Sequence, residues 1–97
     1  MDNTLVLHAK VLFREQLRRT PAGIAVLSFQ VEHNSLQTEA GQPREIALEM
    51  DCVAIGKNAQ TLEQVSIGDQ LELTGFLANR SKKSRWVVFH VTEFELK

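Results

Sequence analysis

The 97-residue chain has little of several features that would place it in a familiar class of protein. It contains one cysteine, so an internal disulfide is excluded, and its net charge of −1 differs from the overall positive charge of many duplex-DNA-binding proteins. No apolar run approaches the ~20 residues that a membrane-spanning helix needs. The first residues also lack the basic region and apolar stretch of a secretory signal. We therefore expect one cytoplasmic domain, residues 1–97, with no part in a membrane.

Signatures of catalysis and of metal or cofactor binding are also missing from the sequence. Three histidines and one cysteine give no zinc-ligand spacing, and there is no glycine-rich phosphate loop. Cys52 is a conceivable nucleophile, but it stands on the apolar side of a strand-like alternation, where a cysteine is usually a small core residue. We expect a protein that is not an enzyme and has no catalytic residue, metal or cofactor.

Alternation of apolar and polar residues predicts a chain built mainly of β-strands. The alternating segments are Leu5 to Phe13, Ile24 to His33, Glu45 to Val53, Gln70 to Leu77 and Trp86 to Leu96. The turn residues Pro21 and Gly23 separate the first two strands. After the third strand, Lys57 to Val65 has the apolar spacing of a short helix, which we expect to plug one end of the sheet.

Two segments do not follow a simple period. The polar segment from Asn34 to Arg44 contains a glycine and a proline and has no consistent alternation, so we expect a long, mobile loop there. In the last strand, Val87, Phe89 and Val91 form one apolar set. A second set is formed by Val88, Phe94 and Leu96. A β-bulge that switches the faces of the strand would reconcile the two sets.

Three strands, a short helix and two more strands in about a hundred residues match an all-β OB fold, a five-stranded barrel. The fold class predicted here therefore has one short helix and two long loops, between strands two and three and between strands four and five. The sheet face and long loops of this fold commonly hold oligonucleotides, although a fold alone does not establish a function.

The loop between strands four and five has the densest positive charge in the chain. Residues 79–86 include no acid and four cations: Arg80, Lys82, Lys83 and Arg85. Lysine and arginine attract phosphates, and the ring of Trp86 can stack on an unpaired base for about 1–3 kcal/mol. These properties favour single-stranded DNA binding. Two simpler explanations stay open: the cations keep an exposed loop soluble, and Trp86 packs on the barrel end or in a dimer contact.

Five short motifs carry a resemblance to a known family. They are Leu5-Val6-Leu7, Thr20-Pro21-Ala22-Gly23-Ile24, Val31-Glu32-His33, Gln37-Thr38-Glu39-Ala40-Gly41 and Gly75-Phe76-Leu77. In order and spacing they resemble PriB, the primosomal replication protein N family, which is related to bacterial single-stranded DNA-binding proteins. The resemblance implies a homodimer of OB folds that binds single-stranded DNA without marked sequence preference. It also implies that the protein stimulates the PriA helicase, with other primosome proteins, in replication restart.

The resemblance further implies which residues contact DNA. The positions that match the family's basic loop are Arg80, Lys82, Lys83 and Arg85. Arg18 and Arg44 align with other cationic positions near that surface. The loop is about two residues shorter than in well-known members, and Ala47 stands where some members have a DNA-stacking tryptophan. Because that ring is missing and the carboxylates that flank Ala47 would repel phosphates, we expect weaker binding or a shifted DNA path.

Two further expectations concern protein partners. Glu45, Glu49 and Asp51 flank Ala47 and would repel a phosphate backbone, so an alternative function is a protein–protein adaptor with little nucleic-acid binding. Homodimerisation is also expected on physical grounds, because an apolar second face near the first strand needs cover. The residues of that face are Val6, Leu12, Ile24 and Val26.

Overall fold

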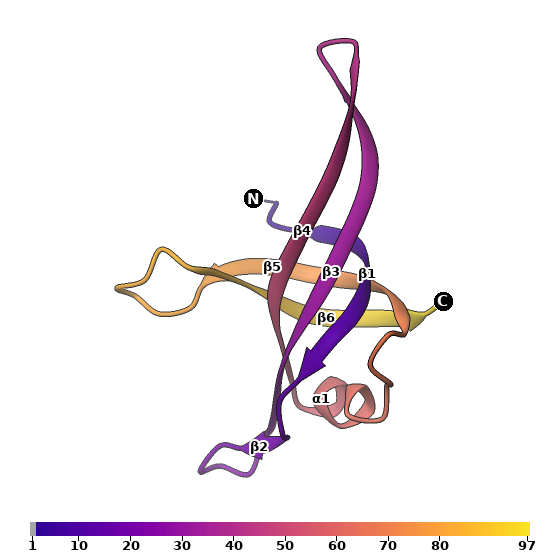
Figure 1. Cartoon of the computed structure of the whole chain (residues 1–97). Helices are drawn as coiled ribbons and strands as arrows, with labels where there is room; N and C mark the ends of the chain where they lie inside the picture. Colours follow the sequence, from indigo (N-terminus) through magenta and orange to yellow (C-terminus); the bar gives the residue numbers. More distant parts are fainter. Residues whose placement is uncertain (1) are drawn as a thin grey trace.

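The fold of residues 2–97, described by a computed structural model, is almost entirely β-structure. Its elements are β1 (Leu5–Arg14), β2 (Arg18–Arg19), β3 (Ala25–Glu39), β4 (Gln42–Ile55), α1 (Lys57–Leu62), β5 (Gln70–Asn79) and β6 (Val87–Leu96). All five predicted strands and the short helix are present (Figure 1). The additional strand, β2, has two residues and pairs with the start of β3.

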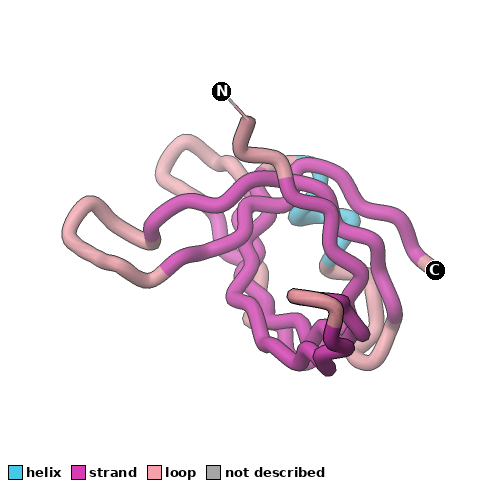
Figure 2. The backbone as a smooth tube through the Cα atoms, turned by 90° about the horizontal axis from the view of Figure 1, so that it is seen from above, coloured by secondary structure: helices cyan, strands magenta, loops and turns pink. Residues whose placement is uncertain are grey.

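The strands form one sheet that closes into a barrel. Their order is β1-β5-β6-β4-β3-β2, and a further antiparallel pairing between β1 and β3 closes the ring. Viewed along another direction, the strands surround a common interior (Figure 2). Five long strands, one short helix and this closure confirm the predicted OB fold.

The barrel interior holds the apolar side of each strand. The side chains that are almost completely buried include Leu27, Val31, Leu71, Leu73 and Phe89. Below the barrel in Figure 1, α1 covers one end, and its buried residues Ala59 and Leu62 belong to the same core cluster. The expectation that this helix plugs one end of the sheet is therefore confirmed.

The prediction of a long, mobile loop over residues 34–44 is wrong. This segment is the outer part of a β-hairpin, in which β3 and β4 pair from Val26 opposite Ile55 to Glu39 opposite Gln42. The turn consists of Ala40 and Gly41, with φ angles of 52° and 76°. Such a turn suits the twist of a hairpin. The hairpin extends well beyond the barrel as a β-arm (Figure 1). Most of its side chains are exposed, so the arm has no buried face and no apolar alternation.

The predicted bulge in the last strand is confirmed. Thr74 of β5 lies opposite Glu93, whereas the next residue, Gly75, lies opposite Val91, so Thr92 is an extra residue in β6. The bulge moves Phe94 to the side of Phe89 and Val91, and Phe94 packs against the core.

One part of the expected dimer face is wrong, because Val26 is only 6% exposed in the single chain.

Candidate nucleic-acid interface

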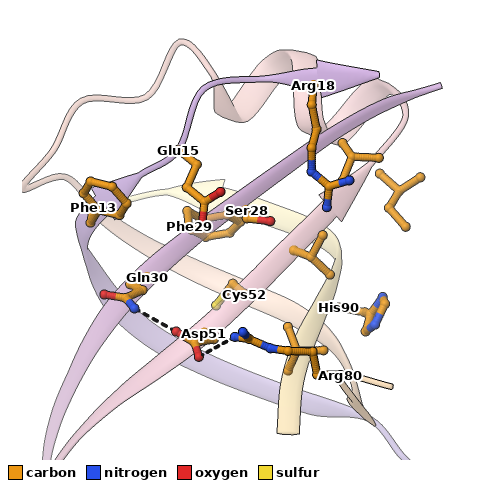
Figure 3. A pocket seen from close by; sticks show the side chains of 14 residues that line it. Phe13, Glu15, Arg18, Ser28, Phe29, Gln30, Asp51, Cys52, Arg80 and His90 are labelled. Atoms are coloured by element: carbon orange, nitrogen blue, oxygen red, sulfur yellow. Dashed lines mark hydrogen bonds and ion pairs between the residues drawn. The ribbon is translucent and has the colours of Figure 1, made fainter. Parts of the chain in front are cut away.

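An open groove of about 640 Å³ lies on the outer face of β3 and β4. Ser28 and Gln30 of β3 and Asp51 and Val53 of β4 form part of its floor. The connection between β1 and β3 borders one side, and the end of β5 borders the other (Figure 3). In the OB fold this is the face, between the first and last long loops, that commonly receives oligonucleotides.

Two of the predicted cationic residues line this groove. Arg18 comes from β2, and Arg80 directly follows β5. Both side chains reach toward the groove in Figure 3. They are 62 residues apart in sequence (80 minus 18), and only the closure of the barrel brings them to one surface.

Asp51 joins the floor of the groove to the side bordered by the end of β5 through hydrogen bonds. Its Oδ2 accepts a hydrogen bond from the Arg80 guanidinium at 2.9 Å, and its Oδ1 accepts one from Gln30 Nε2 at 2.9 Å (Figure 3). Arg80 is therefore already paired with a carboxylate. A phosphate that binds Arg80 must compete with Asp51 for the same N–H groups.

The remaining predicted cations of the β5–β6 connection lie in an exposed loop, which we call the basic loop (residues 80–86). The Arg80 backbone N–H donates to the Trp86 carbonyl at 2.8 Å and closes the loop at its base. Its tip is a turn in which the Ser84 N–H donates to the Ser81 carbonyl. The side chains exposed on this loop include Lys82, Lys83 and Arg85. The loop projects away from the barrel (Figure 1), so an extended ligand can reach its side chains.

Trp86 is 75% exposed, so packing against the barrel end is excluded for the single chain. Its backbone N–H is fixed by the Ser84 hydroxyl at 3.0 Å, while its ring is open to solvent. An exposed indole next to a cluster of cations has the chemistry of a base-stacking position. A dimer contact remains the alternative use of this ring.

Arg44 is not part of the groove lining. It lies on the β-arm near the Ala40–Gly41 turn, and its guanidinium forms an ion pair with Glu39 of the facing strand. The structure thus brings Arg18, Arg80 and the basic loop to one side of the barrel. It leaves Arg44 on the separate arm (Figure 1).

The acidic character of β4 is as the sequence predicted. Glu45, Ala47 and Glu49 are exposed, and Asp51 is about one-third exposed. The sequence did not single out Gln30 or the pairing of Asp51 with Arg80. The only indication in the sequence was that Gln30 falls on the polar side of the alternation in β3. The contact itself could not be foreseen, because it depends on the strand register that sets Gln30 opposite Asp51.

Cys52 lies beneath the groove floor as a core residue and is 2% exposed. Burial, and to a smaller extent the charge of Asp51, raises the pKa of its thiol to about 12. The nucleophilic thiolate is therefore scarce at neutral pH. Within residues 2–97, no group of three or more metal-ligating side chains is gathered in one place. In the same part of the chain, no helix has the length and apolarity to cross a bilayer.

Comparisons with known proteins agree with this geometry. A family model described as "another single-strand binding protein family" matches residues 3–93. The replication restart protein PriB of Bordetella pertussis is 38% identical over 94% of this chain and 85% of its own length. PriB of Nitrosomonas europaea is 32% identical over 94% of this chain and 84% of its own length.

Solved structures give the same result. PriB of Ralstonia solanacearum has a TM-score of 0.90 and 30% identity, with both chains covered completely. The single-stranded DNA-binding protein of Thermus aquaticus has a TM-score of 0.78 and covers 98% of this chain and 50% of its own. At 20% identity this second likeness concerns the fold alone. From sequence and structure together, the chain belongs to the PriB family of replication restart proteins, within the single-strand binding protein group.

Proposed function

We propose that this protein binds single-stranded DNA and acts in replication restart as an accessory to the PriA helicase and other primosome proteins. It acts by binding and catalyses no reaction. The observation that carries the proposal is the combination on one side of the barrel of the groove, two arginines that line it and the exposed basic loop ending in Trp86. PriB relatives with near-complete coverage support the place in replication restart.

In this proposal the cations hold the sugar-phosphate backbone and the ring of Trp86 stacks on one base. Lys82, Lys83 and Arg85 are exposed, so phosphates can reach them without displacing core side chains. Arg18 would guide the strand into the groove on β3 and β4. Arg44 would contact only a strand long enough to reach the β-arm. Neither phosphate contact nor stacking reads base identity, so binding is expected to be insensitive to sequence.

The salt dependence of oligonucleotide binding tests the proposal. With four or five cations on phosphates, the slope of log affinity against log salt should be about −3, since each contact with a single strand contributes about −0.7. Trp86 is the only tryptophan and reports binding through its own fluorescence. Duplex DNA and RNA oligomers of equal length serve as comparison ligands. No binding even at low salt would contradict the proposal.

The alternative function is an OB-fold adaptor that docks a protein on its acidic β4 surface and binds little nucleic acid. The exposure of Glu45 and Glu49 favours this second candidate. The same titration separates the two functions, because an adaptor gives a slope near zero or no signal. Binding of PriA helicase that is unaffected by saturating oligonucleotide would then support the adaptor.

Neutralising Asp51 should strengthen DNA binding. In Asp51→Asn, Arg80 loses its charged partner and one negative charge leaves the groove, so we expect affinity to rise about two- to fivefold, as for an exposed ion pair. The control is Glu49→Gln, which removes the same charge from the same strand but not from Arg80. Equal gains in both variants would show a general charge effect and would contradict direct competition for Arg80. The measurement is the oligonucleotide titration at fixed salt.

We also propose a homodimer. β1 pairs with β5 from Leu5 onward but with β3 only from Lys10 onward, so Leu5–Ala9 have one open edge in the single chain. Val6, in this segment, is 55% exposed. A second copy would satisfy both features. Sedimentation equilibrium should show twice the 10.9 kDa chain mass, and Val6→Asp should shift it toward monomer. A monomer at micromolar concentration in the unmodified protein would contradict the dimer.

A further inference from the structure

A pair of stacked rings lies on the outer face of the barrel, beside the groove. Phe76 of β5 and His90 of β6 are directly opposite in the strand register. Their ring centroids are 4.8 Å apart and their planes differ by 6°. Phe76 is 39% exposed, so this aromatic surface is presented to solvent and is not part of the core.

A small second groove of about 220 Å³ adjoins this pair. Val53 and Ile55 of β4 form its apolar wall, and Ile55 is 51% exposed. Asn58 at the start of α1 borders the other part, where its amide donates to the Thr92 carbonyl at 2.8 Å. The second groove thus combines ring faces, aliphatic side chains and one fixed amide. Pockets for small ligands are commonly lined in this way, by apolar and aromatic side chains with a few fixed polar groups.

The two grooves share walls. Val53, Ile55 and His90 line both, so the outer surface is continuous from Arg18 and Arg80 to Phe76. The second groove is also smaller than the roughly 300–1,000 Å³ of pockets for drug-sized ligands. It has room for one ring system and not for a large metabolite. A strand held by its phosphates at the arginines would carry its bases onto this surface.

We propose that Phe76 and His90, with Ile55, form a stacking subsite for one unpaired nucleobase of bound single-stranded DNA. This inference rests on the proposed function and deepens it by naming a base contact away from the basic loop. Ala47 on β4 has no ring. Phe13 of β1 also lines the first groove as an exposed ring, but the stacked pair of rings that borders the second groove comes from β5 and β6. Stacking accepts any base, because every base has a π-face.

A set of oligonucleotides, each with a single abasic position, tests the subsite. One position should bind the unmodified protein about 5- to 150-fold more weakly than the intact strand does, as expected for one stacked base. Phe76→Leu, which keeps an apolar side chain, should lose a similar factor with the intact strand and become insensitive to that abasic position. Leu96→Ala, an exposed apolar change on β6 outside both grooves, is the control and should leave the pattern unchanged.

The outcomes separate the inference from the proposed function. If the unmodified protein binds DNA but Phe76→Leu keeps its affinity and the full abasic pattern, the subsite is wrong while the proposed function stands. If Phe76→Leu changes the oligomer mass in sedimentation and not the abasic pattern, the surface is a contact between copies and the subsite is again wrong. Failure of the unmodified protein to bind any oligonucleotide overturns both.

Discussion

Reversing two charges of the basic loop is expected to abolish oligonucleotide binding. In Lys82→Glu/Lys83→Glu two phosphate contacts become repulsions, so affinity near 0.1 M salt should fall roughly a hundredfold or more. Both side chains are exposed, so the fold and the free energy of unfolding should change little. The measurement is a titration followed by Trp86 fluorescence, together with circular dichroism to verify the fold.

Neutral and distant substitutions are the controls for this variant. Lys82→Gln/Lys83→Gln removes the contacts without adding repulsion, and its salt slope should be smaller in magnitude by about 1.4, which is twice 0.7. The oligonucleotide affinity of a variant with the charge of Lys97 reversed can be compared with that of a variant with the charge of Lys82 reversed. Lys97 ends the chain on the side of the barrel away from the basic loop (Figure 1). Unaltered binding in the double reversal would remove this loop from the interface.

The second large effect is expected from Gly75→Ala, which should destabilise the barrel. A Cβ at this position would overlap the backbone carbonyl oxygen of His90 and would lie 3.0 Å from the ring of Phe89. Backbone cannot yield as a flexible side chain does. We expect a loss of about 3 kcal/mol in the free energy of unfolding, the upper part of the range for overpacking. The melting temperature should fall by at least about 12 °C, at 4–8 °C per kcal/mol for a domain of this size.

A neighbouring change tests whether the effect belongs to Gly75. Thr74→Ala alters the preceding residue of β5, whose side chain is partly exposed, and should cost less than about 1 kcal/mol. Urea unfolding of both variants gives the comparison. If Gly75→Ala is as stable as Thr74→Ala, then β5 and β6 do not approach each other at the bulge as closely as described.

How much of the fold could be predicted depends on where each side chain is buried. Met50 and Cys52 alternate with Glu49 and Asp51 because one side of β4 faces the core and the other faces solvent. Ile46 and Leu48 continue this alternation as half-buried residues outside the core cluster. The bulge was also predictable, since two apolar sets in β6 required a change of face. The β-arm was not predictable, because neither of its faces packs on the core and a two-residue turn with Ala40 in its first position has no strong signal.

The candidate site divides in a similar way. The basic loop is local and contiguous, and the sequence alone indicated its positive charge and the tryptophan at its end. The groove joins residues from separate strands, and the sequence did not indicate that Asp51 would pair with Arg80 or that Phe76 would stack on His90. The same limit applies to Trp86: its sequence position allowed both a packed and an exposed ring, and only the tertiary structure excluded packing on the barrel.

By itself, the sequence determined the elements that repeat locally: five strands, one short helix, a face-switching bulge and a basic loop. These follow from the polarity of neighbouring residues, which acts over a few positions of one chain segment. The tertiary structure decided the register, the length of the β-arm and the meeting of Arg18, Arg80 and Asp51 on one surface. Those features depend on which strands pair when the barrel closes, and that choice is set by packing among residues far apart in the chain.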